Sequence, residues 1–220
     1  MKEPEQMADF FNARAETYDD HMRETVSWFE EFYDSVSTCI AKTKDQIHIL
    51  NIGIGTGLEL KGIFEQAPNA IITGIDMSEE MLNKLKEKYV EHLKQITLVQ
   101  ESFMTFPFGE ATYDYIVSVM TLHHLLPNEK LKLYERVKKA LKNTGKYIEG
   151  DFVVTDEEAS NYLRKYEEWS KANKGIEEGS HHIDIPLSFE TQRCLLAKAG
   201  FSEVRVIRQG SKDAVYCARP

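Results

Sequence analysis

Between residues 46 and 154, short continuous apolar runs alternate with segments in which apolar residues recur every three or four positions. A short continuous run is typical of a strand buried on both faces, and the longer period is typical of an amphipathic helix. Strands that alternate with helices favour right-handed crossovers, so we expect a parallel sheet with helices on both faces. The runs predict strands at 47–52, 70–75, 96–99, 115–119 and 146–154.

The N-terminal segment has a helical pattern without strands. Apolar residues at 7, 10 and 11 share one helix face, and a longer apolar stripe runs from 26 to 40. Between them lies a polar stretch at 15–21, which contains Tyr18 and predicts a joint between two helices. We therefore expect two helices before the first strand.

The alternation is interrupted again after residue 154. Thr155 and Glu158 have the spacing of a capping box and predict a helix that ends near Gly175. An irregular stretch at 179–186 follows this helix. The turn 209–211 is so short that the strands beside it must form an antiparallel hairpin. The last predicted elements are a helix at 188–199 and strands at 204–208 and 214–218.

Composition narrows the class of protein. The 220 residues are 42% apolar, which suits one domain with a sizeable core. A net charge of −9 repels phosphate backbones and argues against nucleic acid as a partner. No apolar stretch approaches the roughly 18 residues of a membrane span, and the polar start is unlike a secretory signal. Three widely spaced cysteines favour a reducing compartment. We expect a cytoplasmic protein without a membrane segment.

A glycine-rich loop and an aspartate carry the first candidate chemistry. Gly53, Gly55 and Gly57 follow the first predicted strand, where glycine allows a sharp turn and a close approach of a ligand. Leu58 stands where the dinucleotide fingerprint requires its third glycine, so the loop is a poor pyrophosphate cradle. Asp76 ends the second strand, where a carboxylate accepts ribose hydroxyls. A plain tight turn is the structural alternative for the glycines, and a helix N-cap is the alternative for Asp76. The glycine loop and Asp76 together, each after a predicted strand, favour a nucleoside site.

Four segments, at 49–60, 72–76, 113–125 and 141–148, occur in the order of the motifs of class I S-adenosylmethionine-dependent methyltransferases, and the chain closely resembles that family. The segment Asn-Ala-Arg-Ala-Glu-Thr-Tyr-Asp before residue 20 resembles the N-terminal cap of its small-molecule members. The resemblance implies an α/β fold, with a Rossmann-like, doubly wound, mostly parallel seven-stranded sheet, a C-terminal antiparallel hairpin and an N-terminal helical cap.

The resemblance also implies which residues bind S-adenosylmethionine and its product S-adenosylhomocysteine. The glycines pass under the methionine portion, Asp76 takes the ribose, Met77 packs on the adenine, and Met120 begins the stretch over the sulfonium. Asn51 and Ser102 stand where the family usually has acidic residues, and Glu59 and Glu101 are candidates to compensate. The expected cofactor contacts are Tyr18, Asn51, Gly53, Gly55, Gly57, Asp76, Met77, Ser102, Phe103 and Met120.

Histidines supply the candidate chemistry on the acceptor side. His123 follows the fourth strand at the edge where such sheets bind ligands, and an imidazole is suited to act as a base. The alternative is that His123 and His124 only cap the next helix and pack. The run from His181 and His182 to Asp184 suggests a metal site with imidazole and carboxylate ligands, but no third ligand is predicted nearby, so we expect no metal. The alternatives are a polar substrate contact and a solvated loop.

The predicted organisation is one domain, 1–220, with four parts. Its lid-like insertion carries an aromatic stripe at Tyr162, Tyr166 and Trp169, which either packs on the core or walls the acceptor. The parts are a helical cap at 1–45, a nucleoside-binding core at 46–154, the insertion at 155–187, and a C-terminal helix and hairpin at 188–220.

We expect an enzyme that transfers a methyl group to a small-molecule acceptor by in-line displacement. The alternatives are a methyltransferase acting on tRNA or protein, and a non-catalytic nucleoside-binding protein of the same fold. The acidic net charge argues against tRNA, and the changes at Asn51 and Ser102 keep the non-catalytic alternative open. The acceptor, the atom that is methylated, the use of a base and the oligomeric state stay open.

Overall fold

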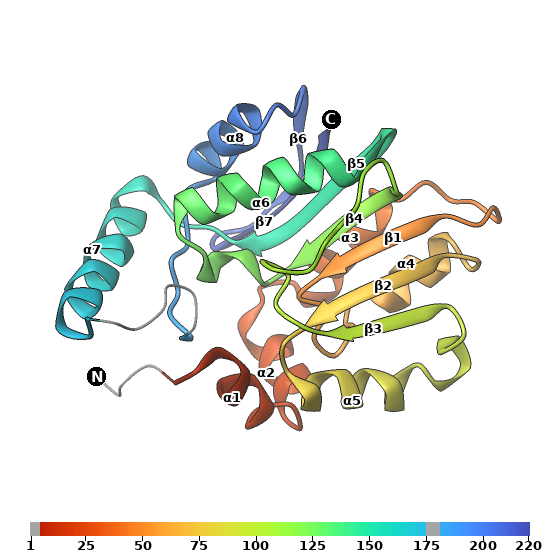
Figure 1. The fold of residues 1–220 in the computed structure, drawn as a ribbon, viewed down its shortest axis with the longest axis horizontal. Helices are drawn as coiled ribbons and strands as arrows, with labels where there is room; N and C mark the ends of the chain where they lie inside the picture. Colours follow the sequence, from red (N-terminus) through yellow and green to blue (C-terminus); the bar gives the residue numbers. More distant parts are fainter. Residues whose placement is uncertain (1–4, 175–180) are drawn as a thin grey trace.

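The computed structural model describes residues 5–174 and 181–220. A seven-stranded sheet runs through the molecule in the order β3-β2-β1-β4-β5-β7-β6, as Figure 1 shows. The first five strands pair in parallel, and β7 pairs antiparallel with both β5 and β6. This confirms the predicted fold class. The strands are β1 (His48–Ile52), β2 (Ile71–Asp76), β3 (Ile96–Gln100), β4 (Tyr113–Val119), β5 (Leu141–Phe152), β6 (Glu203–Gln209) and β7 (Asp213–Arg219).

Helices cover both faces of this sheet. Buried residues of α3, α4 and α5 form one apolar layer, and those of α6 and α8 form the other. Each layer buries a face of strands that are apolar on both sides, which stabilises the parallel sheet. The helices are α1 (Met7–Asn12), α2 (Tyr18–Thr25), α3 (Phe29–Thr38), α4 (Leu60–Gln66), α5 (Glu79–Lys88), α6 (Pro127–Ala140), α7 (Asp156–Ala172) and α8 (Phe189–Lys198), with short 3-10 turns η1 (Val90–His92) and η2 (Leu122–His124).

The N-terminal helices differ from the sequence prediction. The expected polar joint at 15–21 is wrong from Tyr18 onward, because α2 begins there with Asp19 and Asp20 in its first turn. Acidic side chains near a helix N-terminus are stabilised by the helix dipole. The stripe predicted from 26 to 40 is not one helix, since the chain turns at Trp28, with a φ of +55°, before α3 begins.

Two further boundaries follow local chemistry. Thr155 caps α7, and the side chain of Glu158 accepts the backbone N–H of Thr155 at 3.0 Å, as the capping box predicts. The strand predicted at 146–154 begins earlier, since β5 starts at Leu141. Gly175, the predicted helix end, lies outside the described residues. No helix in the described ranges has both the length and the apolar content that crossing a membrane requires.

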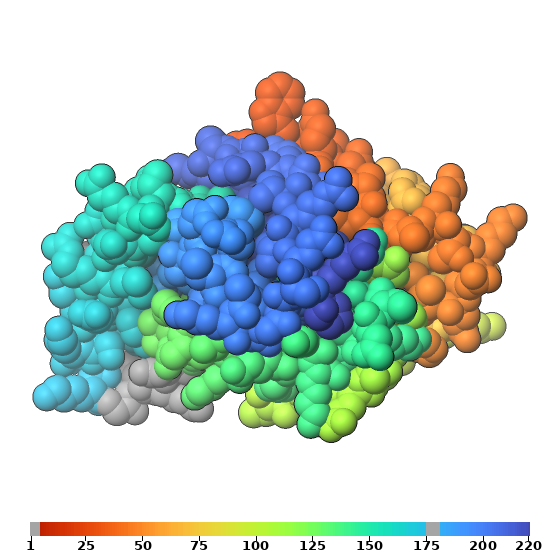
Figure 2. Space-filling model, turned by 90° about the horizontal axis from the view of Figure 1, so that it is seen from above, coloured from red at the N-terminus to blue at the C-terminus, as the bar shows by residue number. Residues whose placement is uncertain are grey.

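The arrangement leaves the end of the sheet at the carboxyl termini of the parallel strands free for a site. Helices α1 and α2 lie beside this end in Figure 1. Helix α7 instead extends to one end of the molecule, which Figure 2 shows as the teal-to-cyan region beside the blue C-terminal segment. Side chains that follow β1, β2 and β4 therefore meet the N-terminal helices.

Candidate active site

Three glycines fold the loop that follows β1. The φ angles of Gly53, Gly55 and Gly57 are +66°, +50° and +72°, a region that residues with a side chain rarely adopt. A Cβ atom at Gly53 would collide with the side chain of Thr121, whereas a Cβ atom at Gly55 would have no other atom within 4 Å. Glycine at position 55 therefore keeps a space open beside the backbone.

The carboxylate of Asp76 is held against this loop. One of its oxygens accepts the backbone N–H of Gly55 at 2.8 Å, and the other accepts that of Ser78 at 2.9 Å. Burial raises the pKa of Asp76, although these N–H donors act in the opposite direction. Ser78, not Asp76, is the N-cap of α5. Each Asp76 oxygen has a further lone pair, so the carboxylate has the acceptors that two ribose hydroxyls need.

A cavity of about 380 Å³ opens beside the loop, and we call it the glycine-loop cavity. It collects residues from the ends of β1, β2, β3 and β4 and from α1 and α2. Eight of the ten expected cofactor contacts line it, while Asn51 and Gly57 do not. The eight are Tyr18, Gly53, Gly55, Asp76, Met77, Ser102, Phe103 and Met120.

Asn51 and Glu59 form a buried pair behind the loop. The side-chain amide of Asn51 donates to Glu59 Oε1, and the side-chain oxygen of Asn51 is buried without a hydrogen-bond partner among the described residues. Burial raises the pKa of Glu59 to about 7. The carboxyl group that is missing at position 51 is thus present eight residues later in the chain, in contact with the residue that replaces it.

The other acidic candidate lies elsewhere. Glu101 accepts the hydroxyl of Thr105 at 2.9 Å and does not line the glycine-loop cavity. Ser102 accepts the backbone N–H of Met104 at 3.3 Å and lines the cavity beside Phe103. This end of the cavity is therefore mostly apolar, and Glu101 does not replace the acid that is absent at position 102.

A second cavity of about 660 Å³ adjoins the first, and we call it the histidine cavity. Phe11, Tyr18, Met120 and His124 line both cavities, so the two spaces share a wall. Met120 has a φ of +48° directly after β4, an unusual conformation for a side-chain-bearing residue. The remaining lining residues are Phe10, Arg14, Thr17, His21, Met22, Thr25, Val26, Ser27, His123, Phe152, His182, Asp184, Ser211, Lys212 and Asp213.

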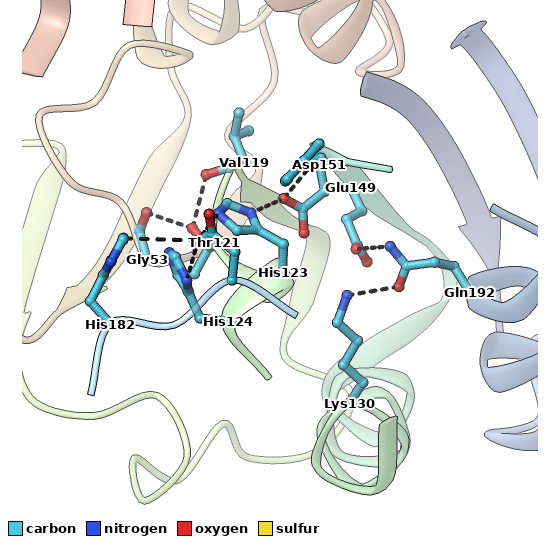
Figure 3. Close-up of polar contacts among 12 residues, drawn as sticks. Gly53, Val119, Thr121, His123, His124, Lys130, Glu149, Asp151, His182 and Gln192 are labelled. Carbon is cyan, nitrogen blue, oxygen red and sulfur yellow. Dashed lines mark hydrogen bonds and ion pairs between the residues drawn. The ribbon is translucent and has the colours of Figure 1, made fainter. Parts of the chain in front are cut away.

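His123 and Asp151 form a close pair in the wall of the histidine cavity. Nδ1 of His123 lies 2.6 Å from Oδ1 of Asp151, which is fully buried on β5 (Figure 3). Burial lowers the pKa of His123, but the Asp151 carboxylate outweighs it and raises the pKa above its ordinary value. The sequence analysis missed Asp151, although a carboxylate inside an apolar strand run was a signal for it.

A buried polar network stands behind this pair. Lys130 on α6 donates to Gln192 on α8 at 2.9 Å, and Gln192 donates to Glu149 on β5 at 3.5 Å (Figure 3). Tyr134 and Tyr147 also donate to Glu149, at 2.9 and 2.7 Å. Burial opposes the ionised form of Asp151, but His123 and Lys130 hold its pKa below the ordinary range. The network joins α6 and α8 to β5 and fixes the strand that carries Asp151.

Three imidazoles surround the carboxylate of Asp184. Its Oδ1 lies 3.3 Å from His124 Nδ1, 3.9 Å from His123 Nε2 and 4.0 Å from His182 Nε2. Burial lowers the pKa of His182 to about 4, and the neighbouring histidines lower that of Asp184 to about 2 against the effect of its own burial. The expectation of no further ligand-type residue near His182 and Asp184 is wrong.

The reason is a tertiary contact that the sequence does not show. The backbone N–H of Ile185 donates to the carbonyl of His123 at 2.6 Å, and Val153 bridges to Leu187 in parallel. These contacts hold residues 185–187 against η2 and β5. Histidines that are 59 positions apart in the chain, His123 and His182, therefore lie around one carboxylate.

The aromatic stripe of α7 does not reach either cavity. Tyr166 is buried, Tyr162 packs edge-on against Phe152, and Trp169 packs near His181. None of the three is among the lining residues of the described cavities. Of the described residues in the predicted insertion at 155–187, His182 and Asp184 alone line these cavities, whereas α1 and α2 contribute to both.

Known proteins match this chain over most of its length. Residues 49–145 match the model of a methyltransferase domain family. An uncharacterized methyltransferase of Geobacillus sp. strain WCH70 is 29% identical, over 88% of this chain and 84% of the relative. A carboxy-S-adenosyl-L-methionine synthase of Trichodesmium erythraeum is 30% identical, over 88% of this chain and 81% of the relative.

Solved structures share the fold at low sequence identity. DhpI in complex with SAH superimposes with a TM-score of 0.70 and 16% identity, covering 97% of this chain and 94% of DhpI. Human N-acetylserotonin methyltransferase in complex with SAM gives a TM-score of 0.63 and 18% identity, covering 96% of this chain and 55% of the human protein. At these identities the likeness concerns the fold alone.

Proposed function

The chain belongs to the class I S-adenosylmethionine-dependent methyltransferases, and we propose that its methyl acceptor is a small molecule held in the histidine cavity. The observation that carries this proposal is the wall of Phe11, Tyr18, Met120 and His124 that the two cavities share. A volume of about 660 Å³ suits a small molecule, since such ligand pockets span roughly 300–1,000 Å³.

We place the cofactor in the glycine-loop cavity. Asp76 would accept the ribose hydroxyls, and Met77, Ser102 and Phe103 would surround the adenine. Glycine at position 55 leaves the space that the methionine portion needs. Asn51 does not line the cavity, but its buried, unpartnered side-chain oxygen behind the loop offers an acceptor for the ammonium group, with the carboxyl group of Glu59 next to it. These residues therefore fit S-adenosylmethionine despite the two departures from the family pattern.

The reaction we propose is an in-line displacement at the place where the two cavities adjoin. A lone pair of the acceptor forms a bond to the methyl carbon, and the electrons of the carbon–sulfur bond return to the sulfonium sulfur. The protein contributes alignment and the exclusion of water. An acceptor hydroxyl would give its proton to Nε2 of His123, while Asp151 orients the ring through Nδ1.

A second candidate function follows from one relative. The Trichodesmium protein, at 30% identity over most of both chains, is named a carboxy-S-adenosyl-L-methionine synthase. Such an activity would change the cofactor itself instead of releasing S-adenosylhomocysteine. The cationic side chains Arg14 and Lys212, which line the histidine cavity, would suit an anionic co-substrate. The product derived from the cofactor distinguishes the two functions by mass.

The test is an acceptor screen read by mass spectrometry. Purified protein is incubated with S-adenosylmethionine and a library of small hydroxyl, amine, thiol and carboxylate compounds, and in parallel with total tRNA and with a protein extract. Release of S-adenosylhomocysteine with a small molecule supports the proposal, and Asp151→Asn should reduce this release. Release only with tRNA or protein would overturn it, and a carboxylated cofactor would establish the second candidate.

A further inference from the structure

We propose that His123, His124, His182 and Asp184 form a binding site for a divalent transition-metal ion of the Zn²⁺ type. The candidate ligand atoms of His123, His124 and Asp184 all lie within 4.8 Å of one another. His182 Nε2 lies 4.0 Å from the same Asp184 oxygen. Imidazole nitrogens and a carboxylate oxygen are the ligand types that Zn²⁺, Fe²⁺ and Co²⁺ accept.

The spacing of the ligand atoms suits one shared ion. Adjacent ligands of a tetrahedral zinc ion at about 2.0–2.1 Å lie roughly 3.3 Å apart. The Asp184 oxygen lies 3.3, 3.9 and 4.0 Å from the three imidazole nitrogens. The distances from Asp184 therefore exceed this spacing by less than about 1 Å, and Asp184 lies on a segment outside the helices and strands.

The environment of His123 is the second, independent observation. A metal-binding histidine usually donates its other ring N–H to a carboxylate, which fixes the tautomer and directs the free nitrogen at the ion. Nδ1 of His123 has this partner in Asp151, at 2.6 Å and fully buried. Nε2, the nitrogen that faces Asp184, is therefore the one left with a lone pair. A histidine that only capped the next helix would need no buried carboxylate behind it.

The location gives the ion a use in the proposed reaction. All four residues line the histidine cavity, and His124 also lines the glycine-loop cavity. An ion that took an acceptor oxygen as a fifth ligand would hold it next to the shared wall and lower the pKa of its hydroxyl, so that the proton leaves to the solvent. The acceptor class would then be compounds with an oxygen donor for a metal. This use rests on the proposed function, whereas metal binding itself does not.

The two roles of His123 are alternatives at one nitrogen atom. In a metal-free enzyme Nε2 takes the acceptor proton, and in a metal-bound enzyme the same atom is a ligand. In the free protein, Nδ1 of His124 lies 3.3 Å from both Asp184 and the carbonyl of Ile183, so its proton bridges them. Metal binding would move that proton to Nε2 of the ring.

The experiment measures metal binding without catalysis. The full chain is stripped with a chelator, dialysed and titrated with Zn²⁺ by calorimetry and with Co²⁺ by visible absorption. We expect one equivalent of each, with Co²⁺ bands in the visible range and displacement of Co²⁺ by Zn²⁺. Asp184→Asn and His182→Ala should each weaken binding by roughly 10-fold or more. His21→Ala, which removes another histidine of the same cavity, should bind Co²⁺ as the wild type does.

Each variant must bind S-adenosylhomocysteine with the wild-type dissociation constant, which shows that the fold is intact. No stoichiometric binding by the wild type, or unchanged binding by both Asp184→Asn and His182→Ala, would overturn the inference. If metal binding fails while a small molecule still releases S-adenosylhomocysteine, the proposed function stands alone. If the metal binds and no small molecule reacts, the proposed function fails and the metal site stands.

Discussion

The two adjoining cavities are built from different parts of the chain. The glycine-loop cavity depends on backbone conformation, since Gly53 and Gly55 have left-handed φ angles and a backbone N–H of the loop binds Asp76. The histidine cavity depends on side chains that come from α1, α2, η2, β5 and the segment with His182 and Asp184. A cofactor common to a family suits a site built from backbone, and an acceptor specific to one member suits a site built from exchangeable side chains.

Their electrostatics differ in the same way. Beside the glycine loop, burial raises the pKa values of Asp76 and Glu59, and few cations offset this. In the histidine cavity, imidazoles lower the pKa of Asp184 to about 2, and Asp151 raises that of His123. The first region holds carboxylates that a cationic cofactor would stabilise. The second holds paired groups suited to a proton or a metal ion.

The largest expected effect breaks the glycine-loop cavity alone. Gly55→Val would place a branched side chain in the open space beside the loop, so we expect the affinity for S-adenosylhomocysteine to fall by roughly a thousandfold, about 4 kcal/mol. Calorimetry measures the affinity. Circular dichroism must show a folded protein, and Co²⁺ binding at the histidine cavity should be unchanged. A folded variant that still binds would mean that the ligand does not occupy this space.

A stability measurement tests the buried carboxyl group of Glu59. Its pKa is raised to about 7 in the folded protein, so between the ordinary pKa of a glutamate and pH 7 the unfolded chain releases a proton that the folded chain keeps. Stability therefore falls as the pH rises through this window. Glu59→Gln should raise the free energy of unfolding at pH 8 by up to about 3 kcal/mol, and by less at pH 5.

Urea unfolding at the two pH values measures this difference. Glutamine keeps the acceptor for the Asn51 amide, so the comparison isolates the charge. Glu101→Gln, which changes a more exposed carboxylate outside both cavities, is measured at the same two pH values as the control. An equal effect of Glu59→Gln at both pH values would rule out a buried charge at this position.

The next largest effect tests Asp76 as the acceptor of the ribose hydroxyls. Asp76→Ala should weaken S-adenosylhomocysteine binding by ~1.5–3 kcal/mol, the scale for hydrogen bonds to a charged group. Part of the loss reflects the Gly55 and Ser78 N–H groups, which lose their acceptor. Asp114→Ala is the control, because Asp114 pairs with Lys142 near the start of β4. An unchanged dissociation constant for Asp76→Ala would contradict the ribose assignment.

The smallest effect tests the wall between the cavities. Burial raises the pKa of Tyr18 well above its ordinary value, so its hydroxyl is a neutral donor. Tyr18→Phe keeps the ring and removes one hydrogen bond, so we expect a loss of about 0.5–1.5 kcal/mol in S-adenosylhomocysteine affinity. Tyr33→Phe, a buried tyrosine that lines neither cavity, is the matched control. Equal affinities for wild type and Tyr18→Phe would exclude a direct cofactor contact by the hydroxyl.

Local signals were enough to predict the fold. The continuous apolar runs mark strands buried on both faces, and the short turn before β7 permits only an antiparallel pair. The predicted boundaries of the N-terminal helices were wrong, because the local pattern there is compatible with two structures. The stripe from 26 to 40 continues across Trp28, but the backbone there has a φ of +55° and starts a new helix. Asp19 and Asp20 give the polar pattern of a joint, but acidic residues also favour a helix N-terminus, and α2 begins there.

The sequence by itself determined the glycine-loop half of this protein, because Gly53, Gly55 and Asp76 depend on backbone angles and strand ends that are encoded within about 25 consecutive residues. Only the tertiary structure decided the other half. Asp151, His182 and Asp184 reach His123 from 28 to 61 positions away, through strand pairing and the bond from Ile185 to the His123 carbonyl. A carboxylate within an apolar strand run marks Asp151 locally, but no local pattern shows which residues meet His123, since that depends on how β5 and the segment after α7 pack against η2.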